Sequence, residues 1–532
     1  MKNSSSIIAF FAGCFFLIAQ PDSLAPVHSV LDTNNIKFTT MANGDMGWDY
    51  TGRTMRAPKE SETGYLYASS LWLASRDMYG NLHVAANEFN QDGLDFWAGP
   101  FADNYDADYD EKYNRSWLIS SDQIEYHRAH FTETGYEMVE VIENWPGNGD
   151  VTNGESAQLA PYYDANTNGI YEPHYGDFPL IRGDKAVFVM YNEDREEHVN
   201  SGGVKIGAEI HMMLYAYDST LPELDNSVLV HYEVFNRGSN NFYEFYAGMW
   251  DDWDLGAFND DLIACDTSRN VSIVYNGDNS DETVYSVDSS YIFNGYGNNP
   301  PAAGLVSLNE DMYVHWYWNN NFDPMIGNPQ DPEHYFNYLN GLWKNGLESG
   351  FSRYRFNAQL EDTTDLDFGP NTPNERKSLH GIFIPTFLPG ESFCLDFAYV
   401  YARNTSYTAK ENAVLLMDYV DDVQFFYDDH FSSCTDHTAD FDGLSIGELS
   451  VSSNFELIKD VDGGSWVLRD ESVVNSIYTV QLVNTLGQLV YNVPWNSENE
   501  LSMNLRQFTS GVYYVHIIEA GIVKNTLPLV KE

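Results

Sequence analysis

The chain has 532 residues, and its 79 acidic residues against 27 Lys and Arg give a formal net charge of -52. Such a charge repels phosphate backbones and disfavours anionic lipid surfaces, which excludes nucleic-acid binding as a function. The hydrophobic content of 43% and the aromatic content of 15% indicate a folded, β-rich chain. The length predicts two or more domains.

Residues 1–25 have the pattern of a secretory signal peptide. Lys2 supplies a positive charge, and an apolar run extends from Ile7 to Ala19. This run is too short to span a bilayer, which needs about 20 apolar residues. Ala19 and Ala25 are suitable cleavage positions, so we expect export through the periplasm.

Residues 26–430 are expected to form an all-β, sandwich-like body of one or two units, the two being near 26–150 and 155–430. Short apolar strands such as Ala186–Tyr191 and Ser227–Phe235 alternate with turns rich in Gly, Asn and Asp. One amphipathic helix is predicted near the end of the body, from Thr408 to Tyr427. The polar, acidic segment 431–446 is the expected linker to a C-terminal domain.

Cysteine usage indicates neither a disulfide framework nor a zinc site. After the signal peptide, Cys265, Cys394 and Cys434 remain. Three cysteines over this length allow one bridge, for which Cys394 and Cys434 are the candidate pair.

The strongest candidate site is the segment Asp164-Ala-Asn-Thr-Asn-Gly-Ile-Tyr-Glu172. Oxygen ligands at alternate positions, followed by a glycine that permits a sharp turn, can wrap a hard cation such as calcium. The twelfth position is Tyr175 instead of Glu, so the loop is no EF-hand and is closer to the Asp-rich loops of dockerins and thrombospondin-type repeats. The alternative is a polar turn stabilised by its own backbone. The expected ligands are Asp164, Asn166, Asn168, the Ile170 carbonyl, Glu172 and Asp177.

A second acidic cluster extends from Asp251 to Asp266, with Trp250 and Trp253 interleaved. Carboxylates that converge without a counter-ion repel each other, so a second calcium site is one interpretation. Paired carboxylates beside aromatic platforms, as in glycoside hydrolysis, are another, and a solvated acidic loop is the third. The expected metal ligands are Asp252, Asp254, Asp260 and Asp261, in a cluster that also contains Asp251, Asn259 and Asp266.

The last part of the chain, residues 447–532, resembles a known export signal. It contains Tyr478–Val490, with a turn at Gly487, then Ser510-Gly-Val-Tyr-Tyr-Val515 and a terminal Thr526-Leu-Pro-Leu-Val-Lys531. These motifs resemble the type A sorting domain of the type IX secretion system of Bacteroidetes. The resemblance implies a small immunoglobulin-like β-sandwich, recognition by the type IX machinery, and release or attachment to a cell-surface anchor.

The body carries a resemblance of its own. Its motifs include Leu71–Gly80, Asp95–Pro100, Glu143–Asp150 and Trp250–Gly256, in this order along the chain. They are similar to a family of large secreted Bacteroidetes surface proteins that has no established activity, which implies location more than chemistry.

Together these patterns predict a secreted or outer-surface protein that is a non-enzymatic, calcium-stabilised adhesive or structural module. No catalytic residues are predicted on this interpretation, and a glycan or another surface ligand is the expected binding partner. The alternative is a secreted polysaccharide-acting enzyme or glycan-binding protein that uses the Asp251–Asp266 carboxylates, with Trp250, Trp253 or Trp316 as platforms.

Overall fold

A computed structural model describes residues 26–431 apart from 49–54, 90–93, 286–291 and most of 349–371, together with residue 433 and most of the strands between 455 and 531. The predicted signal segment 1–25 and nearly all of the predicted linker 431–446 lie outside the described residues. The chain divides into two compact units, Met1–Leu444 and Ser445–Glu532.

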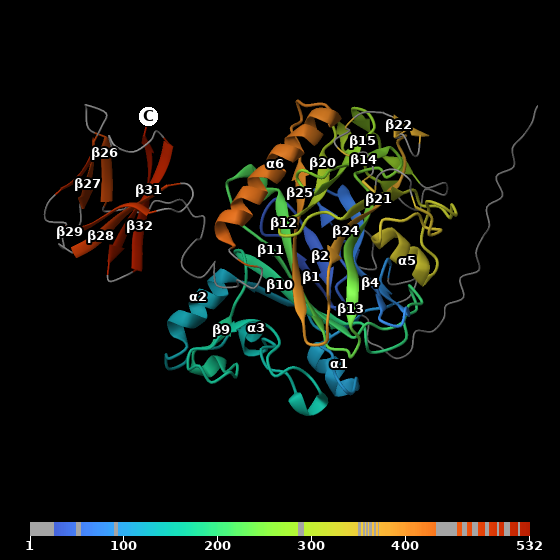
Figure 1. The fold of residues 1–532 in the computed structure, drawn as a ribbon, viewed down its shortest axis with the longest axis horizontal. Helices are drawn as coiled ribbons and strands as arrows, with labels where there is room; N and C mark the ends of the chain where they lie inside the picture. The colour runs from blue at the N-terminus through green and yellow to red at the C-terminus, as the bar shows by residue number, and fades with distance from the viewer. Residues whose placement is uncertain are drawn as a thin grey trace, which may run out of the picture. The chain divides into compact units, whose positions relative to one another are not determined.

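The larger unit is built on two antiparallel sheets that pack face to face (Figure 1). The hydroxyl of Tyr399, in the first sheet, lies 2.6 Å from Ser69 Oγ in the second. The first sheet has nine strands, in the order β14 (Asp261–Asp266), β15 (Val271–Asn276), β20 (Ala302–Ser307), β25 (Ser392–Ala402), β12 (Ser227–Asn236), β11 (Ala208–Ala216), β10 (Lys185–Asn192) and β6 (Trp97–Ala98), with β7 (Trp117–Ser120) also paired to β10. The second has six strands, in the order β21 (Val314–Trp318), β24 (Arg376–Ile384), β13 (Phe242–Trp253), β4 (Gly64–Asp77) and β3 (Met55–Arg56), with β5 (Leu82–Ala86) paired to β4.

Further short strand pairs lie outside these two sheets. They are β1 (His28–Leu31) with β2 (Phe38–Met41), β8 (Tyr162–Tyr163) with β9 (Phe178–Pro179), β16 (Ser280–Asp281) with β19 (Gly297–Asn298), β17 (Val284–Tyr285) with β18 (Ile292–Phe293), and β22 (Thr364–Asp365) with β23 (Gly369–Pro370).

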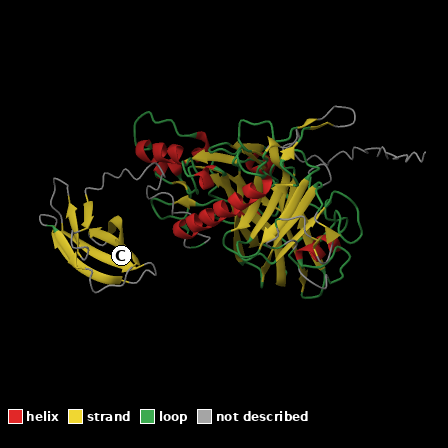
Figure 2. Cartoon of the chain, turned by 90° about the horizontal axis from the view of Figure 1, so that it is seen from above, coloured by secondary structure: helices red, strands yellow, loops and turns green. Residues whose placement is uncertain are grey.

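The central strands are buried on both faces, which explains their nearly continuous apolar sequences. Every residue of β11 is buried, as are all but the first residue of β10. One face of this sheet meets the second sheet, and the other is covered in part by α6 (Ala409–His430), which packs on β25, β15 and β20 (Figure 2). A strand that is covered on both faces has no side exposed to solvent, so its sequence does not alternate between apolar and polar residues.

The predicted late helix is confirmed as α6. Its start is a capping box, in which Thr408 Oγ1 accepts from the Glu411 backbone N–H at 3.3 Å and Glu411 Oε2 accepts from the Thr408 N–H at 2.8 Å. Its buried face includes Leu416, Val423 and Phe426.

Several shorter helices were not predicted from the sequence. They are α1 (Ala107–Tyr113), α2 (Ser121–His130), α3 (Glu140–Glu143), α4 (Pro222–Asp225), α5 (Pro332–Leu339), η1 (Val151–Asn153) and η2 (Pro173–Tyr175). Each is at most three turns long, so none is long enough to show a sustained amphipathic repeat in the sequence. Helix α5 packs over the second sheet, above an aromatic cluster that contains Trp72, Trp250, Trp316 and Trp318.

Strands on both sides of residue 150 share the same sheets. Strand β7 pairs with β10, and β4 pairs with β13. The body is therefore one unit, and the alternative of two units near 26–150 and 155–430 has no counterpart in the sheet pairing.

The smaller unit has two small antiparallel sheets, as expected for a compact β-sandwich. The strand orders are β26 (Phe455–Lys459), β27 (Ser465–Asp470), β30 (Leu501–Asn504), and β29 (Leu489–Asn496), β28 (Ile477–Asn484), β31 (Gly511–Glu519), β32 (Ile522–Lys531). Leu468, Val480, Leu482 and Val515 are among its fully buried core residues. The all-β prediction is confirmed for both units.

Cys394 is disulfide-bonded, and Cys265 is a buried thiol. The predicted partner of Cys394, Cys434, lies outside the described residues.

Candidate functional site

The predicted calcium loop lies on the larger unit between two short strands. Strands β8 and β9 pair through Tyr162 with Pro179 and Tyr163 with Phe178, and this short ladder closes the ends of the loop. Within the loop, Thr167 has a φ angle of 58°. Gly169 has a φ angle of 77°, a left-handed conformation that glycine adopts without the strain that a side chain adds. The sequence therefore places glycine where the chain turns back on itself.

The loop side chains accept hydrogen bonds from the loop's own backbone. Asp164 Oδ2 accepts from the Gly169 N–H at 2.6 Å, and Asp164 Oδ1 accepts from the Asn168 N–H at 3.2 Å. The bond from Gly169 is the main cause that lowers the pKa of the Asp164 carboxyl. Asn166 Oδ1 accepts from Asn168, and Asn168 Oδ1 accepts from Ile170, at 3.0 and 2.8 Å. One ionised carboxylate and two amide oxygens are thus ordered within five consecutive residues.

Glu172 and Asp177 occupy different positions relative to this loop. Asn168 Nδ2 donates to Glu172 Oε2 at 2.6 Å, so the Glu172 carboxylate lies on the loop itself. Asp177 is fully buried, and its two oxygens accept from the backbone N–H groups of Ala165 and Glu172 at 2.9 and 2.7 Å. Because both oxygens serve the backbone, Asp177 clamps the two ends of the loop together. Asp177 is fully buried whereas Asp164 is partly exposed, so the oxygens of Asp164 are accessible to a cation from solvent and those of Asp177 are not.

The donor set of the loop is composed of hard oxygen atoms: two carboxylates, two side-chain amides and the exposed Ile170 carbonyl. Among the described residues, no group of three or more His, Cys, Asp or Glu side chains is placed to hold a metal ion. A cation at this loop would therefore need the oxygens of Asn166, Asn168 and Ile170 as well as the carboxylates. Calcium accepts such mixed oxygen sets, and fewer charged ligands mean weaker binding.

The Asp251–Asp266 cluster does not form one site. Asp251 and Asp252 are consecutive residues of β13, and side chains of consecutive strand residues point to opposite faces of the sheet. Asp261 and Asp266 are the two ends of β14, which belongs to the other sheet. The predicted metal ligands Asp252, Asp254, Asp260 and Asp261 are divided between these surroundings.

Asp251 lies between the two sheets. Tyr399 donates its hydroxyl hydrogen bond to Asp251 Oδ1 at 2.8 Å. The carboxyl is fully buried, and burial raises its pKa to about 7 although the bonds from Tyr399 and Ser69 lower it. Asp251 is thus a polar group of the core that ionises only near neutral pH.

Asp252 faces the opposite side, beside a buried lysine that the sequence analysis did not single out. Lys377 Nζ lies 3.9 Å from Asp252 Oδ2, and the two side chains are 2% and 7% exposed. The same ammonium lies 4.8 Å from the ring centroid of Phe89 and 5.6 Å from that of Trp250. Burial raises the Asp252 pKa well above its ordinary value, and Asp254, Glu375 and Glu88 raise it further while Lys377 lowers it.

The remaining carboxylates lie around the turn between β13 and β14. Asp261 Oδ2 accepts from the Leu255 N–H at 3.2 Å, and Asp261 Oδ1 has no hydrogen-bond partner among the described residues. Burial raises the pKa of Asp261 well above its ordinary value, and Asp260, Asp281 and Asp254 add to this effect. Burial also raises the pKa of Asp260.

The aromatic platforms expected for a carbohydrate-acting site are absent at this cluster. Trp250, Trp253 and Trp316 are each 0% exposed. Trp72 and Trp250 stack with ring centroids 6.0 Å apart inside the core, and Trp253 Nε1 donates to Ser378 Oγ at 2.8 Å. The three rings stabilise the sheet packing, so the alternative that uses them as sugar platforms has no exposed ring face at these residues.

A buried charge network beneath α6 was also not predicted from the sequence. Arg182 Nη1 donates to Asp396 Oδ1 at 2.6 Å, and His231 Nδ1 lies 2.9 Å from the same oxygen. Tyr427, on α6, donates to Asp396 Oδ2 at 2.8 Å. The available signal was Asp396, a single charged residue inside the apolar run of Phe393 to Ala402.

Comparisons with known proteins place one part of the chain in a family. Residues 467–530 match the model of the secretion system C-terminal sorting domain. No curated protein matched the chain. Among the described residues, no helix is both long and apolar enough to cross a membrane.

Solved structures give only a distant likeness. A putative aldose 1-epimerase from Escherichia coli K12 is 9% identical, with coverage of 71% of this chain and 100% of that one and a TM-score of 0.24. Heparan sulfate lyase HepC from Pedobacter heparinus is 8% identical over 70% and 34% of the two chains, with a TM-score of 0.21. The GalM/aldose epimerase homologue from C. elegans is 9% identical over 71% and 99%, with a TM-score of 0.22. At these TM-scores the likeness carries no inference about fold or activity.

The match to the sorting-domain model agrees with the strands of the smaller unit, which cover the same part of the chain. Such a domain directs a protein through the type IX secretion machinery to the outer cell surface or the medium. The chain is therefore an exported protein that carries a type IX secretion C-terminal sorting domain.

Proposed function

We propose that the larger unit is a non-enzymatic surface or secreted module with an adhesive or structural role, stabilised by calcium at the Asp164–Glu172 loop. The observation that carries this proposal is the folded-back loop, in which Asp164 holds the Gly169 and Asn168 backbone N–H groups at 2.6 and 3.2 Å. The same arrangement leaves further lone pairs on the carboxylate and amide oxygens for a cation.

The donor chemistry supports calcium over other metals. Carboxylate, amide and carbonyl oxygens are hard ligands that suit Ca²⁺, and no Cys or His belongs to the loop. Asp164, Asn166, Asn168, Glu172 and the Ile170 carbonyl would hold the ion. Its role there would be structural, because it would brace a loop that Asp177 already closes from the buried side.

The arrangement of the carboxyl groups in the second acidic cluster supports a non-enzymatic role. A glycosidase needs two carboxyl groups facing one substrate-sized space. Asp251 and Asp252 face opposite sides of one sheet, and the neighbouring Trp250 and Trp253 are fully buried. The polysaccharide-acting alternative at this cluster therefore receives no geometric support. The proposed partners of the module are a cell-surface anchor and a glycan or other surface ligand.

Thermal unfolding of the purified chain with calcium and with chelator tests the calcium proposal. A ligand that binds only the folded state stabilises by about 2.7 kcal/mol at a hundredfold excess over its dissociation constant. We expect calcium to raise the Tm of the larger unit and Asp164→Ala to remove most of that rise.

Asp323→Ala is the matched control. Asp323 Oδ1 also accepts two backbone hydrogen bonds, from Met325 and Ile326 at 2.8 and 3.0 Å, but lies outside the loop. Its loss should lower the Tm equally with calcium and with chelator. If Asp164→Ala behaves in the same way as this control, calcium does not bind the loop.

A further inference from the structure

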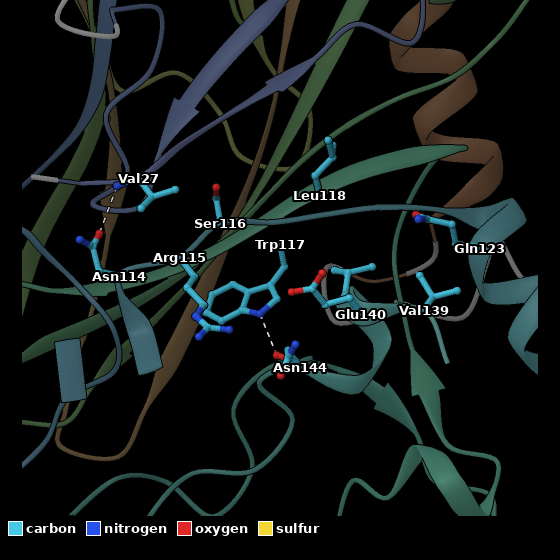
Figure 3. Close-up of a pocket in the computed structure, with 11 residues that line it drawn as sticks. Val27, Asn114, Arg115, Ser116, Trp117, Leu118, Gln123, Val139, Glu140 and Asn144 are labelled. Atoms are coloured by element: carbon cyan, nitrogen blue, oxygen red, sulfur yellow. Dashed lines mark hydrogen bonds between the residues drawn. The ribbon is translucent and has the colours of Figure 1, made fainter. Parts of the chain in front are cut away.

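Two neighbouring pockets lie beside β7, where α1, α2 and α3 meet the nine-stranded sheet. Figure 3 shows the residues that line the first of them. Their volumes are about 440 and 510 Å³, both within the range of roughly 300–1,000 Å³ that is usual for small-molecule sites. Arg115, Trp117 and Asn144 line both pockets, so the two spaces share one wall. An extended ligand could occupy both sides of that wall.

The shared wall is held rigidly by the sheet. Trp117 pairs with Phe188 across the β7–β10 ladder, and its Nε1 donates to the Asn144 backbone carbonyl at 2.8 Å (Figure 3). Trp145, which lines the second pocket, donates its Nε1 to the Pro161 carbonyl at 2.9 Å. Both indole N–H groups are bonded to backbone, and each side chain is only 4% exposed, so the small surface that these rings present to the pockets is apolar.

Exposed hydrogen-bonding groups surround this apolar wall. Arg115 donates its Nε to the Glu111 carbonyl at 3.2 Å, and its terminal amino groups have no hydrogen-bond partner in the described part of the chain. The side-chain amide of Asn144 and the carboxylates of Glu140 and Glu143 likewise make no hydrogen bond to any described residue. Donors and acceptors are therefore interleaved around the two pockets.

The charge balance at the pockets excludes strongly anionic ligands. Four exposed carboxylates line them, against the cations of Arg115 and Lys112. The Lys112 ammonium also lies 3.5 Å from the buried carboxylate of Glu155, which compensates part of its charge. Phosphate, sulfate and uronate groups would meet net repulsion here, in a chain whose formal charge is -52. The lining carboxylates are Asp108, Glu111, Glu140 and Glu143.

A neutral sugar has the complementary chemistry. Each of its hydroxyl groups both donates and accepts, which suits guanidinium, amide and carboxylate groups set side by side. The apolar C–H faces of its rings can pack on the accessible aliphatic part of the lining, to which Val27, Val139 and Val141 contribute. We propose that the paired pockets bind a neutral oligosaccharide, with Arg115 and Asn144 hydrogen-bonding its hydroxyl groups from the shared wall.

This inference deepens the proposed adhesive role by naming a ligand class, and it is independent of calcium. The test measures binding by the full chain, by calorimetry, to cellohexaose, maltohexaose, mannohexaose, xylohexaose and laminarihexaose, with hexagalacturonate as the anionic comparison. Each titration is done with calcium and with chelator. Binding that persists in chelator would uphold this inference even if the calcium proposal fails.

We expect at least one neutral hexasaccharide to bind with a Kd below 1 mM, and hexagalacturonate to bind at least tenfold more weakly. Arg115→Ala and Asn144→Ala should each weaken binding about tenfold, the loss of about 1.4 kcal/mol that removal of a hydrogen-bonding group predicts, with an unchanged Tm. Arg76→Ala, which removes another exposed arginine that lines neither pocket, should change the Kd less than twofold.

Three results would overturn the proposal. They are no binding of any neutral hexasaccharide at 10 mM, binding that both pocket variants leave unchanged, and a preference for hexagalacturonate.

Discussion

The Asp164–Glu172 loop and the Asp251–Asp266 segment are both rich in acidic residues, but their side chains have different neighbours. In the loop, Asp164 is partly exposed and its carboxylate is bonded to nearby backbone N–H groups, which lower its pKa. In the second segment, Asp251, Asp252 and Asp261 are buried, and burial raises their pKa values. Closely spaced acidic residues in a loop thus bring their oxygen atoms together, whereas the same density in strands places them on different faces.

The two regions should also differ in what a substitution costs. Removing a carboxylate from the loop removes hydrogen bonds that water can replace. Removing a carboxyl group from the strands has one of two effects. It leaves a buried positive charge without its partner, or it removes a buried acid whose ionisation is unfavourable in the folded state. The sign and size of each effect therefore distinguish the two surroundings.

The largest effect is expected for Asp252→Ala. Above the raised pKa of Asp252 the two side chains form a buried ion pair, and Asp252→Ala would leave the Lys377 ammonium without the carboxylate 3.9 Å away, which costs about 3–5 kcal/mol. Urea unfolding of the variant measures the loss. The double variant Asp252→Ala/Lys377→Met is the control, since replacing both charges should restore most of the stability. A single-variant loss under about 1 kcal/mol would show that Lys377 is compensated by other groups.

Asp251→Asn should change how stability depends on pH. The folded-state pKa is about 7, above the value of an exposed aspartate. The native carboxyl therefore stays protonated while the unfolded one ionises, so the wild type loses stability as the pH rises from about 4 to about 7. Three pKa units correspond to roughly 4 kcal/mol, and Asn, which cannot ionise, should be spared that loss.

The measurement is the free energy of unfolding of wild type and Asp251→Asn at intervals between pH 4 and pH 8. The two proteins should be most alike at pH 4, and the variant should gain on the wild type up to about pH 7 and no further. A difference that does not vary with pH would mean that the Asp251 carboxyl titrates normally in the folded protein.

Glycines in the two regions provide a smaller contrast. Gly169 and Gly256 have nearly the same φ angles, 77° and 76°. A Cβ on Gly169 would meet no atom within 4 Å, whereas one on Gly256 would collide with the Asp281 carboxylate. That carboxylate cannot easily move, because it accepts from the backbone N–H groups of Ala257 and Tyr296 at 3.0 and 2.6 Å.

Gly169→Ala should therefore lower the free energy of unfolding by about 1–2 kcal/mol, the cost of a side chain in the left-handed conformation. Gly256→Ala should lower it by about 2–4 kcal/mol, because steric overlap with Asp281 is added. Chemical unfolding of both variants under one condition makes the comparison. Equal costs would show that the turn after β13 relaxes as freely as the exposed loop.

The sequence predicted the fold class and the sorting domain well, for reasons that particular elements make clear. Apolar strands such as β10 and β11 and the capped helix α6 are specified by local pattern, and the tail motifs are local as well. The face on which Asp251 or Asp252 lies depends on strand pairing with β4 and β24, which involves residues more than a hundred positions away. Local acidic density carries no information about that pairing.

The candidate site was predictable only where it is local. The Asp164 loop is closed by residues within fifteen positions, and its hydrogen bonds follow from the spacing of Asp164, Asn166 and Asn168. Asp177 was assigned to the ligands because its buried position beneath the loop cannot be read from its spacing. The surroundings of Lys377 and the paired pockets around Arg115 are formed by separate segments of the chain, so they could not be predicted from the sequence.

The smallest effect is expected for Asp266→Asn, at the far end of the same acidic segment. Asp266 bonds to Arg269 Nη1 at 2.8 Å, but Arg269 also holds Asp421 of α6 through two bonds of 2.8 Å. Burial alone would raise the Asp266 pKa, but the hydrogen bonds from Ser268 and Arg269 outweigh burial and lower it. The stability that the ionised Asp266 carboxylate contributes to the wild type should therefore be lost as the pH falls through the acidic range.

At neutral pH the loss in Asp266→Asn should be below about 1 kcal/mol, because the arginine keeps its bidentate partner and a partly exposed ion pair contributes little. Urea unfolding of the variant beside Asp252→Ala checks both the size and the order of the two effects. If Asp266→Asn cost as much as Asp252→Ala, burial would not be what separates the acidic residues of this segment, since the Asp266 side chain is 10% exposed and bonded to an arginine that reaches solvent.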